Sequence, residues 1–149
     1  MEQINEKAVW ERVTGGKQND GPVGPVLLEL IGRKQEDARG YRMLAGKMNP
    51  EQQRVLRLMA SEVGQQVRLL GAIYYLLTGK KAEKTVPGAS LREAGTAGIC
   101  MMLRREDGSR LTEAAERCTG QVREALLSMA EQDARRFHRL LQLLGQILE

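Results

Sequence analysis

The chain has 149 residues, of which 42% are hydrophobic, 28% are charged and only 3% are aromatic, and its formal net charge is +4. This length and balance are typical of one globular domain with its own core. Neither half of the chain is a basic block, which argues against nucleic-acid binding, and no apolar run approaches the roughly 20 residues of a membrane span. The acidic, polar start gives no sign of a signal peptide, so we expect a cytoplasmic protein.

Residues 1–24 are expected to lie outside the main domain. Residues 2–13 have the loosely amphipathic pattern of a short helix that contains Trp10, the single tryptophan. Glycines and prolines then crowd residues 14–25, which predicts a linker. We expect Trp10 to anchor the short helix on the main body; the alternative is that this helix binds a protein partner.

Four long helices are predicted within residues 25–149. The first spans 25–47, and the second spans 50–78, with Asn49 as its N-cap and Gly79 as its terminator. A capping box at 90–93 begins a third helix that is expected to continue to about residue 118, although 106–109 also resembles a turn. The fourth helix follows Gly120. The chain is therefore predicted to be an all-α four-helix bundle, with a crossover or an up-down-up-down order both open.

An internal repeat relates the two halves of this bundle. Residues 55–77 and 126–148 share their apolar positions at a constant offset, and Glu62 in the first copy falls on Asp133 in the second. Two copies of an apolar helical face, each interrupted by one carboxylate, indicate a duplicated helical hairpin with an acidic residue at the centre of each half.

Three stretches carry a resemblance to a known family: YRMLA at 41–45, MASE at 59–62 with IYYLLTG at 73–79, and MAEQD at 129–133. Over residues 25–148 the chain resembles ferritin-like, rubrerythrin-type di-iron proteins, by pattern more than by identity. The resemblance implies a ferritin-like four-helix bundle in which each half supplies a Glu seven residues before a Tyr, and a Glu-x-x-His motif. Two such half-sites bind two irons in the bundle core.

The chain departs from this ligand pattern at most positions. Where the resemblance implies carboxylates and histidines, only the acids Glu62 and Asp133 remain. The six matching positions are Lys34, Glu62, Gln65, Arg105, Asp133 and Arg136. Because an unpaired buried carboxylate is costly, we expect internal ion pairs in place of the metals. The expected pairs are Lys34 with Glu62, and Arg105 with Asp133, joined by Arg136; the alternative is that these are ordinary surface charges.

These observations favour a degenerate ferritin-like protein without a di-iron centre or other cofactor, in a non-catalytic structural or binding role. The first alternative is an iron- or manganese-binding oxidoreductase of the rubrerythrin or peroxidase type. Its all-carboxylate site would consist of Glu36, Glu62, Glu106 and Asp133. A small helical regulator that binds nucleic acid or another protein is a third hypothesis. We also expect a homodimer formed through the long helix faces.

Overall fold

The computed structural model describes residues 23–83, 94–106 and 108–149. These residues form five helices and no strand: α2 (Gly24–Ala45), α3 (Pro50–Thr78), α4 (Gly95–Arg105), α5 (Ser109–Glu116) and α6 (Gly120–Leu148). The prediction of an all-α protein is therefore confirmed for this part of the chain.

Three sequence predictions cannot be compared with the structure. The helix at 2–13 with its Trp10, the linker up to residue 22, and the capping box at 90–93 lie outside the described residues. Within the described ranges, none of the helices is long and apolar enough to cross a membrane.

Helix α3 begins and ends where its sequence predicts. The Asn49 side chain accepts a hydrogen bond from the backbone N–H of Gln52, and the Gln52 side chain accepts one from the backbone N–H of Asn49. Pro50 occupies the first turn, where its missing N–H is not needed. Gly79 ends the helix in the left-handed conformation, with φ of 72°, which a glycine adopts without steric strain. Local capping chemistry thus fixes the length of this helix.

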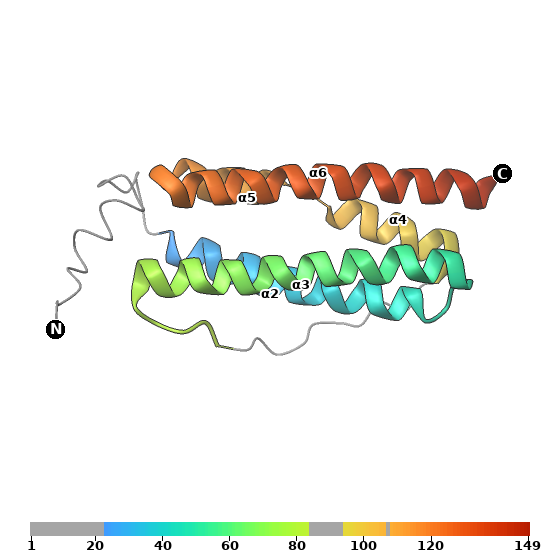
Figure 1. Cartoon of the computed structure of the whole chain (residues 1–149), viewed down its shortest axis with the longest axis horizontal. Helices are drawn as coiled ribbons and strands as arrows, with labels where there is room; N and C mark the ends of the chain where they lie inside the picture. Colours follow the sequence, from blue (N-terminus) through green and yellow to red (C-terminus); the bar gives the residue numbers. More distant parts are fainter. Residues whose placement is uncertain (1–22, 84–93, 107) are drawn as a thin grey trace, which may run out of the picture.

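The helices pack side by side as an elongated bundle (Figure 1). Helices α2 and α6 run in one direction, and α3, α4 and α5 run in the other. Helix α3 therefore ends at one end of the bundle while α4 begins toward the opposite end, which is the crossover order and excludes the up-down-up-down alternative. The α2–α3 hairpin has the most extensive helix–helix contact.

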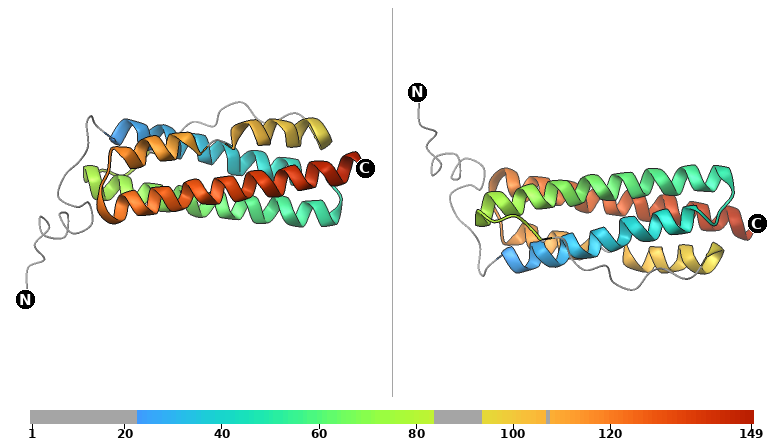
Figure 2. Two further views of the ribbon diagram at one scale, coloured as in Figure 1. Left: turned by 90° about the horizontal axis from the view of Figure 1, so that it is seen from above. Right: turned by 90° about the horizontal axis from the view of Figure 1, so that it is seen from below.

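The third predicted helix is not continuous, so this prediction was wrong. It is interrupted after Arg105, and α4 and α5 follow one another along one edge of the bundle (Figure 2). At the interruption Gly108 passes close to α6, because a Cβ atom there would lie 3.4 Å from the backbone oxygen of Ala130. The turn signal at 106–109 prevails over the repeat because the repeat records apolar positions, not the continuity of the backbone.

The core consists of two apolar clusters, one toward each end of the bundle. The first is built around Leu27, Leu70, Leu111 and Leu126, and the second around Leu44, Met59, Met102 and Leu140. Buried polar and charged side chains lie between them along the helices: Lys34, Asp37, Gln66, Asp133 and Arg136. A charged layer therefore divides the aliphatic core near the middle of the bundle.

Candidate functional site

Helical spacing directs the polar side chains of this layer toward the bundle centre. In α2, Lys34, Asp37 and Tyr41 are three and four residues apart and share one buried face. In α6, Asp133 and Arg136 do the same at a spacing of three. The layer is thus built from the middle of each long helix, where water has least access.

Arg136 is the centre of the layer, and its side chain is 0% exposed. Its guanidinium donates hydrogen bonds to three carboxylates that come from different segments: Glu62 of α3, Glu106 at the end of α4, and Asp133 of α6. The Nε–Oε1 distance to Glu106 is 2.6 Å. Since a guanidinium presents five donors in a fixed plane, one arginine is able to neutralise several convergent carboxylates.

Lys34 provides the second cation of the layer. Its Nζ lies 2.6 Å from Oδ2 of Asp133, and both side chains are almost completely buried. The contact crosses the bundle centre from α2 to α6. Gln66 completes the arrangement, because its amide donates to Oδ1 of Asp133 at 3.1 Å and accepts from Arg136 at 3.1 Å. Asp133 therefore has hydrogen-bonding partners on three helices.

A second group of charges lies on the α2–α4 side of the layer. Arg105 donates to the carboxylates of Asp37 and Glu36, the latter at 3.1 Å. Asp37 is buried and Glu36 is 40% exposed, so this group extends from the interior to the surface. Tyr41 connects the two groups, because its hydroxyl donates to the same Glu106 oxygen that Arg136 contacts.

The charge states follow from these contacts. Burial alone would lower the pKa of Arg136, but the hydrogen bond and charge of Glu106 and the charge of Asp133 outweigh burial and raise it. The guanidinium therefore stays charged. Burial raises the pKa of Asp37, and the adjacent Arg105 offsets only part of this effect. The guanidinium groups of Arg136 and Arg105 therefore hold the carboxylates of the layer in place.

The ion pairs differ from those that the sequence predicts. Lys34 contacts Asp133 of the second half, whereas Glu62 is paired with Arg136 and with Arg139, which was not anticipated. Arg105 does not contact Asp133; it binds Asp37 and Glu36 instead. The predicted Lys34–Glu62 and Arg105–Asp133 pairs were therefore wrong, because the bundle brings side chains of the two repeats together at its centre. The predicted contact of Arg136 with Asp133 is present.

One further correction concerns α3. Gln65, three residues after Glu62, is exposed, and its neighbour Gln66 is the buried residue of the layer. The residues three and four positions after Glu62 both lie on the same helix face as Glu62, so spacing alone could not distinguish Gln65 from Gln66. Asp37 was also missed, although its spacing of three from Lys34 is a signal that could have found it.

Tyr41 offers a direct test of the layer in solution. Its burial, and then the charge of Glu106 and the hydrogen bond to it, raise the pKa of Tyr41 well above the usual value near 10. We expect the ultraviolet phenolate titration of the folded protein to be the same in wild type and in Tyr41→Phe. In denaturant, the wild type should show one more titrating tyrosine. A lower phenolate amplitude for the folded variant than for the folded wild type would contradict the burial of this hydroxyl.

The residues present do not fit a metal centre. Among the described residues, no three His, Cys, Asp or Glu side chains are arranged to hold a metal ion. Glu62, Glu106 and Asp133 all face the Arg136 guanidinium, and Glu36 lies apart from them beside Arg105. One oxygen of Glu106, Oε2, is buried without a hydrogen-bond partner in the described part of the chain. A single free oxygen is far fewer than the four or more ligands that a metal ion requires.

Comparisons with models of known protein families, with curated proteins and with solved structures found no match to this chain.

Proposed function

We propose that this chain is a degenerate ferritin-like bundle in which two cations occupy the place of a di-iron centre, and that it acts as a structural or binding protein rather than as an oxidoreductase. The observation that carries the proposal is the position of Arg136. Its completely buried guanidinium contacts three carboxylates from three segments, at the depth where the resemblance implies two metal ions.

The crossover order of the helices supports the same proposal. Helices α3 and α4–α5 run in the same direction (Figure 1), as in ferritin-like bundles with one long connection. The charged layer also lies between residues of α2, α3, α4 and α6, which is where a ferritin-like bundle builds its metal site from facing helices.

The alternative, an all-carboxylate iron or manganese site, has less support. Of its four residues, Glu36 is the one that lies at the surface beside Arg105. The other three share one guanidinium, which a metal ion would have to displace against the repulsion of Arg136 and Lys34. The sole histidine, His138, is exposed on α6 and adds no nitrogen ligand to the layer.

Metal analysis distinguishes these two functions. We expect protein purified from iron- and manganese-supplemented medium to contain far less than one metal ion per chain. The double variant Lys34→Glu/Arg136→His replaces both cations with the ligand types that the resemblance implies, and it should retain more metal than the wild type. Stoichiometric iron or manganese in the wild type would contradict the proposal and favour the oxidoreductase. The homodimer and the cytoplasmic location stay predictions.

A further inference from the structure

An excess of positive charge lies in the part of the α2–α3 hairpin that spans residues 38–72. Residues 38–72 contain six basic and two acidic side chains, which leaves 17 of the 23 basic and 17 of the 19 acidic side chains for the rest of the chain. One of the two acids, Glu62, is already paired with Arg136 and Arg139. The segment 38–72 therefore carries a formal charge of +4, as large as that of the whole chain.

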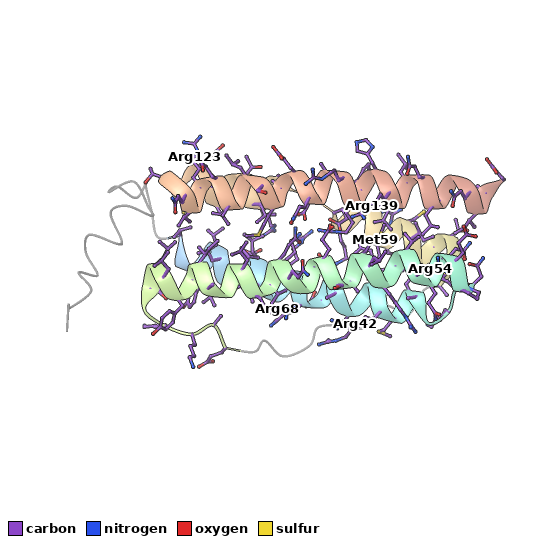
Figure 3. The ribbon with its side chains drawn as sticks, viewed as in Figure 1. Arg42, Arg54, Met59, Arg68, Arg123 and Arg139 are labelled. Atoms are coloured by element: carbon purple, nitrogen blue, oxygen red, sulfur yellow. The ribbon has the colours of Figure 1, made fainter. Side chains whose placement is uncertain are left out.

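Four arginines gather on this face, and we call the surface between them the arginine groove: Arg42, Arg54, Arg57 and Arg68. All four are exposed, and their side chains have no hydrogen bond or ion pair to the described part of the chain. Arg42 and Arg68 project from the side of the hairpin that faces away from α6 (Figure 3). Other arginines of the protein, such as Arg105 and Arg136, form ion pairs. These four have no such partner in the described part of the chain, and are therefore available for an external anion.

The groove is a real depression in the surface. A hollow of about 460 Å³ is lined by Arg42, Arg57, Ala60, Ser61, Gly64 and Arg68. A second hollow of about 380 Å³, which includes Arg54, shares Arg57 with the first. The first volume is within the range of small-molecule sites. The space above Gly64 is open, because a Cβ atom added there would meet no other atom within 4 Å.

The residues of α3 in the groove follow one face of the helix. Arg57, Ser61, Gly64 and Arg68 are separated by four, three and four residues, so the two arginines are about 16 Å apart along the helix axis. Ser61 lies between them and offers a hydroxyl donor. Guanidinium groups bind phosphate oxygens with paired, charge-assisted hydrogen bonds. The extended row favours an elongated anion with several phosphate groups over a single phosphate.

We propose that the arginine groove binds a short linear polyphosphate chain. The lining of the main hollow contains no aromatic side chain on which a nucleotide base could stack. Nucleic acid is also less suited, because the residues outside 38–72 contain as many acidic as basic side chains and so add no net positive charge for a longer backbone. The groove lies outside the charged layer, so this proposal does not depend on the proposed function.

Isothermal titration calorimetry with inorganic tripolyphosphate tests the proposal on the full chain. We expect tripolyphosphate to bind at least about tenfold more tightly than orthophosphate, since it contacts more than one arginine. Arg57→Gln/Arg68→Gln should weaken this binding by roughly tenfold or more. The matched control Arg123→Gln/Arg135→Gln removes the same charge from exposed positions of α6, where Figure 3 shows Arg123 far from the groove, and should leave binding nearly unchanged.

Gly64→Leu tests the shape of the site without changing its charge. Because the added side chain extends into the hollow and not into the core, the variant should fold and lose tripolyphosphate binding. Three results would overturn the proposal. The control pair could weaken tripolyphosphate binding as much as Arg57→Gln/Arg68→Gln, or Gly64→Leu could bind tripolyphosphate as tightly as the wild type. The third is that the protein binds a single-stranded DNA with the same number of phosphates more tightly than tripolyphosphate. The last result would assign the groove to nucleic acid.

Discussion

Replacing Arg136 with methionine is expected to lower the free energy of unfolding by about 3–5 kcal/mol, the usual cost of removing one partner from a buried ion pair. The substitution keeps an unbranched apolar stem in place of the arginine stem but removes all charged contacts of the guanidinium. In the described part of the chain, Glu106 would then retain only the Tyr41 hydroxyl as a partner, and Asp133 would depend on Lys34 and Gln66. Urea denaturation monitored by circular dichroism measures the loss, and urea avoids the screening that guanidinium salts cause.

The adjacent arginine provides the control for this experiment. Arg135 is exposed, so Arg135→Met removes the same charge from the same helix without leaving a buried carboxylate unpaired. Its effect should stay within about 0.5 kcal/mol, as for most surface substitutions. A loss below about 1 kcal/mol for Arg136→Met would mean that the charged layer does not hold the bundle together.

Asp133→Leu is expected to destabilise the protein by a similar amount, about 3–5 kcal/mol, because it leaves the buried ammonium group of Lys34 without its one ionic partner in the described part of the chain. Adding Lys34→Met should restore much of the lost stability, since the unpaired charge is then gone while Arg136 still contacts Glu62 and Glu106. A double-mutant cycle in urea should give a coupling free energy of about 1–3 kcal/mol between the two positions.

An exposed ion pair is the appropriate reference for that cycle. Glu29 and Arg110 contact one another between α2 and α5, with side chains 59% and 39% exposed. The cycle Glu29→Leu with Arg110→Met should give a coupling free energy below about 1 kcal/mol. If Asp133→Leu/Lys34→Met proves no more stable than Asp133→Leu alone, the Lys34–Asp133 contact is not an important interaction in solution.

The features that could be predicted from sequence depend on local chemistry. The ends of α3 followed from Asn49, Pro50 and Gly79, each of which acts within one helical turn. The all-helical class followed from apolar periodicity in the same way. The interruption between α4 and α5 was missed because the apolar repeat was given more weight than the turn signal at Gly108.

The pairing of charges could not be predicted by the same means. The repeat places Glu62 and Asp133 at the centre of the bundle, and the family resemblance adds Lys34, but neither determines which helix lies opposite which. That depends on the crossover order, which brings Lys34 of α2 to Asp133 of α6 across the bundle centre. The arginine groove was also missed, because its residues come from two helices and the overall charge of the chain is modest.

The division of the core by a charged layer has a consequence for how the helices are aligned. Both apolar clusters consist largely of Leu, Met and Ala, whose contacts are non-directional and so discriminate weakly between alternative positions of one helix along another. Moving α6 by one turn would shift Asp133 and Arg136 by about 5.4 Å and separate them from Lys34 and Glu62. The ionic contacts can therefore form at only one position of α6 along the bundle axis, whereas the aliphatic contacts can form at several. In this bundle a few buried charges favour one longitudinal position of α6 against α2 and α3, and the aliphatic residues supply the cohesion.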